Sequence, residues 1–150
     1  MRISVGSDHA GFHLKRVLVD GLVAQGHEVH DVGTHEAVRC DYPDFAVVVA
    51  REVASKQADL GVLVCGSGLG MAIAANKVAG VRAVAVSDTF SAHASREHND
   101  ANVLCLGERV VGAGLAWDIL DTWLRASFEG GRHADRVAKI NALDHTPSNS

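Results

Sequence analysis

The sequence alternates short β-rich segments with longer segments of helical periodicity, and this alternation limits the chain to few folds. In the first helical segment, Leu14, Leu18 and Leu22 recur at the spacing of one helix face. Strands that alternate with helices in this way pair in parallel, with helices packed on both faces of the sheet. The segments that predict strands are 2–6, 28–32, 60–64, 82–86 and 102–106.

We therefore predict an α/β fold, a three-layer α/β/α sandwich around a five-stranded parallel sheet of the Rossmann-like type. A chain of 150 residues fits one domain with one real core. We expect that domain to span 1–143 and the remaining 144–150 to form a polar C-terminal tail. The first predicted helix contains Leu14, Leu18 and Leu22 and ends at Gly26. The second spans 45–56, and the third runs from the glycine-rich turn to Lys77. The last three span 89–98, 113–128 and 132–143.

Composition and charge exclude several classes of protein. The net charge of −4 argues against nucleic-acid binding, because nucleic-acid-binding domains are usually basic. No apolar run reaches the length of a membrane span, and residues 1–5 enter a strand without the layout of a signal peptide. The cysteines, Cys40, Cys65 and Cys105, are odd in number and lack metal-ligand spacing. We expect a cytoplasmic protein with no membrane partner, no nucleic-acid partner and no bound metal.

The stretch 65–77 carries the strongest functional signal, because a thiol stands where a predicted strand ends and a glycine-rich turn begins a helix. Backbone N–H groups at a helix start carry partial positive charge and favour anions, including a thiolate or the oxyanion of an intermediate. Ligands of parallel sheets bind beyond the carboxyl ends of the strands, where this turn is expected. We therefore expect chemistry on a small anionic ligand. The turn reads Cys65, Gly66, Ser67, Gly68, Leu69 and Gly70.

The three glycines, Gly66, Gly68 and Gly70, match neither common nucleotide-binding pattern. A dinucleotide fingerprint needs its third glycine one place later, where Met71 stands, and a P-loop needs a different spacing to its lysine. One interpretation is a tight turn that needs a positive φ angle. The other is close approach of the backbone to a ligand, which alternating glycines favour.

The thiol of Cys65 also has two interpretations. A free cysteine often behaves as a small buried hydrophobic residue, and Cys40 and Cys105 fit that description. At the end of a strand and facing a helix start, Cys65 is placed to be a nucleophile or a general base. The sequence of the loop alone does not show whether Cys65 is a buried structural residue or a reactive thiol.

Two histidine-containing pairs add candidates. Asp8 and His9 follow the first predicted strand, where they fit either a helix cap or a proton-transfer pair beside Cys65. His98, followed by Asn99, ends a predicted helix, a position that suits a histidine electrostatically without any function.

Three arginines are candidate cations for an anionic ligand. Arg132 and Arg136 share one face of the last predicted helix, either as a solvated basic surface or as a grip on a phosphate or carboxylate. Arg132 lies in the first turn, which is the unfavourable end of the helix dipole for a cation. Arg109 follows the last predicted strand.

Taken together, segments from 2 to about 143 resemble the type B ribose-5-phosphate isomerases, a family that includes relatives acting on galactose 6-phosphate and allose 6-phosphate. One branch of that family has serine at the cysteine position and a glutamate base after the third glycine. Those places hold Cys65 and Met71 here, so the chain resembles the cysteine branch. The resemblance lies in 6–11, 41–44, 65–70, 75–77, 98–102 and 131–140.

The resemblance implies an aldose–ketose isomerase that interconverts ribose 5-phosphate and ribulose 5-phosphate through an enediolate, with no cofactor or metal. By this resemblance, Cys65 is the base that transfers the proton, and Asp8 carries protons between the two sugar oxygens. His98 opens the sugar ring, and the hydroxyl of Ser67 belongs to the catalytic set. The amides of 66–70 hold the enediolate oxygen.

The resemblance also implies a binding set and a subunit arrangement. The family forms homodimers, some of which pair into tetramers, with each active site at a subunit boundary. We therefore expect His98 or the helix at 132–143 to reach the site of a neighbouring subunit. The expected substrate-binding residues are His9, Gly66, Gly68, Gly70, Asn99, Arg109, Arg132 and Arg136.

Two other functions stay open on the sequence. The substrate could be a hexose 6-phosphate, such as allose or galactose 6-phosphate, or another rare sugar, because the depth of a pocket is not visible in a sequence. A nucleotide-binding module without catalysis also fits the α/β pattern with Asp8 at a strand end, but such a module gives Cys65 no task. The sequence distinguishes neither pentose from hexose phosphate nor dimer from tetramer.

Overall fold

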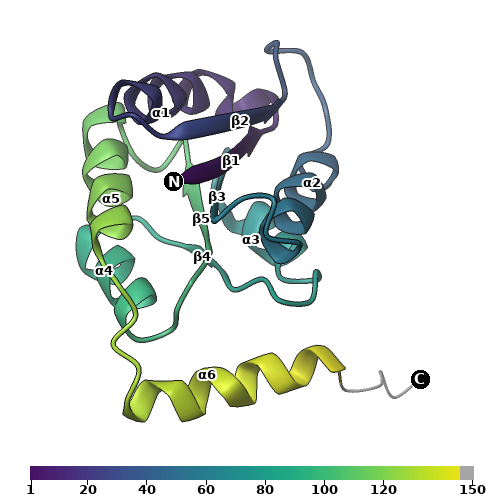
Figure 1. The fold of residues 1–150 in the computed structure, drawn as a ribbon. Coiled ribbons are helices and arrows are strands. Elements are labelled where there is room, and N and C mark those ends of the chain that lie inside the picture. The colour runs from purple at the N-terminus through teal and green to yellow at the C-terminus, as the bar shows by residue number, and fades with distance from the viewer. Residues whose placement is uncertain (146–150) are drawn as a thin grey trace.

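The structure, a computed structural model, describes residues 1–145 and contains a five-stranded sheet in which neighbouring strands run parallel. The strand order is β2-β1-β3-β5-β4, so β2 and β4 form the edges and β3 lies in the centre (Figure 1). The predicted parallel α/β sheet is confirmed. The strands are β1 (Arg2–Ser7), β2 (Glu28–Gly33), β3 (Leu60–Cys65), β4 (Ala83–Ala85) and β5 (Val103–Gly107).

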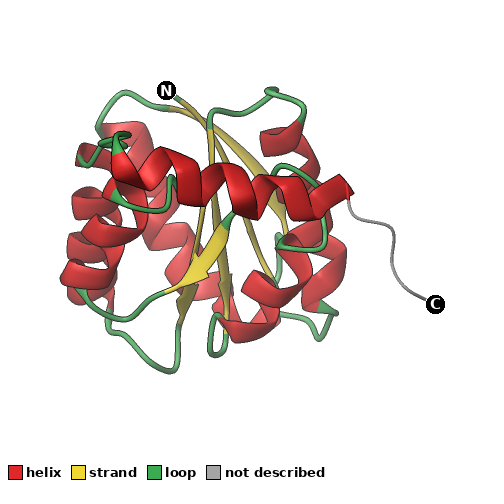
Figure 2. Ribbon diagram, turned by 90° about the horizontal axis from the view of Figure 1, so that it is seen from below, coloured by secondary structure: helices red, strands yellow, loops and turns green. Residues whose placement is uncertain are grey.

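Helices cover both faces of the sheet, as the alternation predicts. In Figure 1, α1, α4 and α5 lie on one face, and α2 and α3 lie on the other. The last helix, α6, crosses the β4 edge instead of covering a face (Figures 1 and 2). The helices are α1 (Phe12–Ala24), α2 (Tyr42–Ala54), α3 (Leu69–Ala75), α4 (Thr89–Glu97), α5 (Ala113–Arg125) and α6 (Arg132–Ala142), with 3₁₀ turns η1 (His9–Gly11) and η2 (Leu143–His145).

Every residue of the central strand β3 is buried, because both of its faces are covered. Successive side chains of a strand point to opposite faces. Val62 and Val64 pack into the hydrophobic cluster under α1 and α5, while Leu63 and Cys65 pack into the cluster under α2 and α3. The alternation therefore turns the thiol of Cys65 toward the α2 and α3 side of the sheet.

Element boundaries differ from the predicted ones where capping and backbone geometry decide. α2 begins at Tyr42 instead of near 45, because Pro43 occupies its first turn, where no backbone N–H is needed. α5 ends at Arg125, before the expected 128, because Ala126 adopts an extended backbone with φ −76° and ψ 152°. Cys40, expected to be buried, is only partly buried on the connection between β2 and α2.

The end of the chain continues past the predicted domain boundary without a break. The 3₁₀ turn η2 follows α6 directly, and the carboxylate of Asp144 accepts a hydrogen bond of 2.8 Å from the N–H of Gly80. The boundary at 143 stays a prediction, and 146–150 of the predicted tail lie outside the described residues. Within the described part of the chain, no helix is both long and apolar enough to cross a membrane.

Candidate active site

A pocket of about 470 Å³ lies at the carboxyl ends of β1, β3 and β5. These strands are neighbours in the order β1-β3-β5, so their ends bring together residues that are far apart in the sequence. Residues that follow these three strands therefore meet in one pocket. The pocket is lined by Asp8, His9, Ala10, Tyr42, Cys65, Gly66, Ser67, Gly70, Arg109 and Val110.

Cys65 is the last residue of β3 and one of the residues that line the pocket, although only 4% of it is exposed. The backbone N–H of Gly68 donates a hydrogen bond of 3.1 Å to Sγ. Cys65 is therefore packed in the core and also lines a cavity, so its role as a reactive thiol stays a prediction. An N–H aimed at sulfur suits a thiolate, which is the form that accepts a proton.

Gly68 and Gly66 play different parts in the glycine turn. Gly68 has φ +80°, a conformation that side chains rarely adopt, so the tight-turn interpretation holds there. At Gly66 the backbone leaves ordinary space, and the nearest atoms belong to Arg109 and Ala10, which also line the pocket. A side chain at Gly66 would therefore lie beside these two pocket residues, and close approach of a ligand to this backbone stays a prediction.

Asp8 is both a cap and a pocket residue. Its Oδ1 accepts hydrogen bonds from the N–H groups of Ala10 (2.9 Å) and Gly11 (3.1 Å), which caps the turn η1. Both of these bonds end on Oδ1, so Oδ2 carries neither of them. Only 6% of Asp8 is exposed, and the pocket that it lines also contains Cys65, so a carboxylate and a thiol share one cavity.

His9 is held by the backbone of a distant segment. Its Nδ1 lies 3.2 Å from both the N and the O of Cys40, so this backbone can donate to Nδ1 or accept from it, depending on the tautomer. Either arrangement fixes the ring plane and leaves Nε2 outside these two contacts. The imidazole therefore lines the pocket in a defined orientation.

The loop after β5 is joined to the glycine turn by two backbone hydrogen bonds. The N–H of Glu108 donates to the carbonyl of Cys65 (2.9 Å), and the N–H of Arg109 donates to the carbonyl of Gly66 (3.0 Å). The exposed side chain of Arg109 lines the pocket. A guanidinium at this position suits an anionic group on the ligand.

Five predicted site residues do not line this pocket in the described chain. One of them, Gly68, belongs to the glycine turn and donates its N–H to Sγ of Cys65. His98 follows α4, and its ring stacks on that of His133 with centroids 4.4 Å apart. Asn99 lines a separate hollow of about 400 Å³ beside the β4 edge. The exposed side chains of Arg132 and Arg136 belong to α6. One chain therefore brings together only part of the predicted set.

The cluster of His98, Glu129 and His133 places three possible metal-ligand atoms within 4.8 Å of one another. The rings of His98 and His133 lie at 15° to each other in a stack. A metal ion at about 2.1 Å from an imidazole nitrogen lies near the plane of that ring. Two nearly parallel rings do not point their nitrogens at one ion, so this arrangement does not form a metal centre.

Tyr42 is a pocket residue that the predicted set lacks. It begins α2, and its ring lies so close to α3 that a Cβ at Gly70 would come within 2.6 Å of the ring carbons. The only signal in the sequence was the segment 41–44, which carried the resemblance without a role for any of its members. Tyr42 reaches the pocket because α2 packs against α3, and this packing cannot be inferred from the positions of the strand ends.

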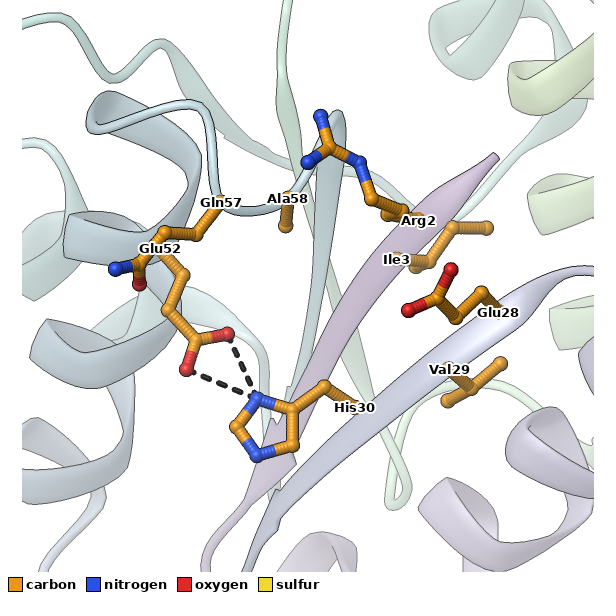
Figure 3. Close-up of a pocket in the computed structure, with 8 residues that line it drawn as sticks. All are labelled: Arg2, Ile3, Glu28, Val29, His30, Glu52, Gln57 and Ala58. Atoms are coloured by element: carbon orange, nitrogen blue, oxygen red, sulfur yellow. Dashed lines mark hydrogen bonds and ion pairs between the residues drawn. The ribbon is translucent and has the colours of Figure 1, made fainter.

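Another hollow, of about 410 Å³, lies at the opposite, amino ends of β1 and β2 (Figure 3). Figure 3 shows the ring of His30 directed at the carboxylate of Glu52, with Nδ1 to Oε1 at 2.9 Å. The imidazole of His30 and the carboxylate of Glu52 therefore pair with each other. This hollow contains neither a thiol nor a glycine turn.

The fold and the pocket define a Rossmann-like α/β protein with a pocket beyond the carboxyl ends of its strands, which is where parallel sheets bind their ligands. Residues 3–140 match the family described as Ribose/Galactose Isomerase. The chain belongs to this family, and the predicted resemblance is confirmed.

Relatives and solved structures are similar along nearly the whole chain. Ribose-5-phosphate isomerase B of Escherichia coli (strain K12) is 52% identical over 143 residues, which cover 95% of this chain and 96% of the relative. The structure of Clostridium thermocellum ribose-5-phosphate isomerase B is 56% identical, with a TM-score of 0.95 and coverage of 96% and 97%. The Mycoplasma genitalium enzyme, solved with bound ribulose-5-phosphate, is 41% identical, with a TM-score of 0.94 and 97% of each chain covered.

Proposed function

We propose that the protein is a ribose-5-phosphate isomerase that interconverts ribose 5-phosphate and ribulose 5-phosphate by proton transfer at Cys65. The observation that carries this proposal is the position of the Cys65 thiol. Its Sγ accepts a hydrogen bond from Gly68 N–H at 3.1 Å, and Cys65 lines the same pocket as Asp8 and His9. The names of the relatives and the bound ribulose-5-phosphate of one of them support the same reaction.

The reaction needs one base that moves a proton between two neighbouring carbons. The thiolate of Cys65 removes the proton from C2 of the open-chain aldose, and the electron pair moves to form the C1–C2 double bond of an enediolate. Asp8 moves a proton from the oxygen on C2 to the oxygen on C1. The thiol then returns its proton to C1, which gives the ketose. A positioned base contributes about 10²- to 10⁴-fold to the rate.

The developing negative charge on oxygen needs donors that are already in place. Gly66, Ser67 and Gly70 line the same pocket as Cys65. We assign the enediolate oxygen to the hydroxyl of Ser67 and to the amides of 66–70, apart from that of Gly68, which donates to Sγ of Cys65. The reaction moves hydrogen within one molecule, so the substrate supplies both the oxidised and the reduced carbon. No external redox cofactor is therefore required by this chemistry.

The phosphate and the ring-closed sugar need groups that one chain does not bring to the pocket. We assign the phosphate to His9 and Arg109, completed by Arg132 and Arg136 from a second copy of the chain. We assign sugar-ring opening to His98 of that copy, with Asn99 beside it as a binding residue. The active site would then lie at the boundary of a homodimer, or of a dimer within a tetramer.

Exposed apolar side chains support this subunit arrangement. Leu69 and Ile73 of α3 are 61% and 65% exposed, and Leu143, beyond α6, is 69% exposed. Leu69 and Ile73 are four residues apart and therefore share one face of α3, next to the glycine turn. A second copy of the chain that covers this face would bring its own residues close to the pocket.

We place the enzyme in the cytoplasm, where its phosphorylated substrates are held.

Turnover of ribose 5-phosphate, compared with allose 6-phosphate and galactose 6-phosphate, tests this function. The proposal expects kcat/KM for the pentose phosphate to exceed that for both hexose phosphates. A higher value for a hexose phosphate would assign the same chemistry to a different substrate. Absence of isomerisation with all three, together with ATP that stays bound through purification, would overturn the proposal in favour of a nucleotide-binding module.

A further inference from the structure

Lys15 is a buried charged side chain that the proposed chemistry does not use. It belongs to α1, and 1% of its side chain is exposed. Its Nζ contacts Oδ1 and Oδ2 of Asp31 at 2.6 Å and 2.8 Å, and donates to the carbonyl of Thr34 at 2.7 Å. Burying a charged group is costly unless it is paired and hydrogen-bonded, and these acceptors satisfy Nζ.

The partners of Lys15 lie where β2 ends and the connection to α2 begins. Asp31 belongs to β2 and also accepts a hydrogen bond from the N–H of Gly33 at 3.0 Å. Thr34 is the first residue after β2, and its N–H donates to the carbonyl of Ser7 at 2.7 Å. Lys15 therefore anchors the start of the connecting segment, which we define as residues 34–41, to helix α1. The N–H of Thr34 separately joins it to the end of β1.

The far end of the connecting segment holds a pocket residue. Cys40 places its backbone N and O at 3.2 Å from Nδ1 of His9. Most residues between these two anchors are exposed to solvent. The segment thus runs from a buried lysine anchor to the backbone groups that orient the imidazole in the pocket.

We propose that Lys15 is a positioning residue that fixes the orientation of His9 through the connecting segment. With the ammonium in place, Thr34 and Asp31 hold one end of the segment, so Cys40 presents its backbone to His9 in one geometry. Without it, the segment samples other positions and the imidazole loses its orientation. The effect on catalysis rests on the proposed function, in which His9 binds the phosphate. The effect on the segment does not.

The first experiment measures the segment itself and needs no substrate. Lys15→Met, and the neutral pair Lys15→Met with Asp31→Asn, are compared with Leu22→Ala, a buried substitution on the same helix that does not touch the segment. Amide hydrogen exchange reports local opening. We expect the Cys40 amide to exchange about tenfold faster in the Lys15 variants than in Leu22→Ala at matched global stability. Unchanged exchange at Cys40 in the Lys15 variants that fold would overturn the proposal.

The second experiment separates positioning from general loss of stability. Because phosphate binding is shared by the ground state and the transition state, we expect KM for ribose 5-phosphate to rise about tenfold, with kcat changed by less than about threefold. In a His9→Ala background, the Lys15 substitution should raise KM no further, because the two residues act through one contact. Equal increases of KM in both backgrounds would contradict the proposal. If the unmodified enzyme does not isomerise ribose 5-phosphate, the proposed function fails, and the exchange experiment still decides the role of Lys15.

Discussion

At the residue scale, the three cysteines show how the fold gives one side chain different chemistry. Cys105 and Cys65 belong to the same hydrophobic cluster, but Cys105 is fully buried and its burial raises the pKa of its thiol. Cys65 ends its strand at the pocket, where the N–H of Gly68 reaches its sulfur. Cys40 contacts His9 through its backbone and not through its thiol. Position at a strand end therefore separates Cys65 from the other two.

Substitution of Gly107, which lies next to the glycine turn, tests whether catalysis needs the turn in its present position. A Cβ at Gly107 would lie 2.6 Å to 2.8 Å from backbone atoms of Ser67, so Gly107→Ala must displace the glycine turn. Displacement of catalytic groups by about 1 Å can cost about 100-fold in rate, and we expect kcat to fall by about that factor. Steady-state turnover of ribose 5-phosphate measures it.

Gly112→Ala is the matched control for this substitution. A Cβ there meets nothing within 4 Å, and the backbone φ of −73° suits any residue. We expect its kcat to stay within about twofold of the original. Normal turnover by Gly107→Ala would contradict the role given to the turn.

At the element scale, much of the architecture follows from the sequence. The β-rich segments located the strands of the described chain to within about one residue. The buried strands β3 and β5 are continuous apolar runs, as parallel strands covered on both faces require, whereas the edge strand β2 contains both apolar and polar residues. Strand ends then placed Asp8, Cys65 and Arg109 in one pocket. Tyr42 was missed because it enters the pocket from the start of a helix, through packing of α2 on α3. Whether His98 completes the site depends on the position of a second chain, which the sequence pattern of a single chain does not predict.

The start of α4 illustrates how a single carboxylate supports an element. Asp88 precedes the helix, and its Oδ1 accepts a hydrogen bond of 2.6 Å from the N–H of Ser91. This bond from the backbone of Ser91 lowers the pKa of Asp88 below its ordinary value of 3.8. A carboxylate whose pKa is lowered by folding stabilises the folded state above its unfolded pKa, and that contribution is lost as the pH falls through the folded pKa.

Asp88→Ala should therefore lower the midpoint of thermal unfolding at pH 7, because the N–H of Ser91 loses its acceptor. The difference from the original protein should shrink as the pH falls below about 4, where the carboxylate of the original protein is progressively protonated. Thermal unfolding of both proteins at pH 7 and near pH 3 measures this. A difference that grows toward low pH would contradict the assigned cap.

At the scale of the whole molecule, the site proposed here is divided between two copies of the chain. The pocket supplies Cys65, Asp8 and His9, while α6 carries Arg132 and Arg136 past the edge of the sheet (Figure 2). A shared site would let the exposed arginines of an edge helix act on the same substrate as a buried thiol. It would also make activity depend on assembly.

Mixing two inactive variants tests the shared site. In a hybrid of Cys65→Ala with the double variant Arg132→Ala, Arg136→Ala, one site carries both defects and the other carries none. Random pairing makes half of the dimers hybrids with one intact site of two, so about a quarter of the original activity should return. Native mass spectrometry verifies that hybrids form. Hybrids without recovered activity would contradict a site that is shared in this way.

The most direct test of the central claim is the turnover of ribose 5-phosphate by Cys65→Ala, with Cys105→Ala as its control. Cys105→Ala removes a thiol from the same hydrophobic cluster and should keep kcat near the original value. Cys65→Ala should retain its fold by circular dichroism while kcat falls by about 10³-fold, because the base that transfers the proton is gone. Near-normal turnover by folded Cys65→Ala would contradict proton transfer by this thiol.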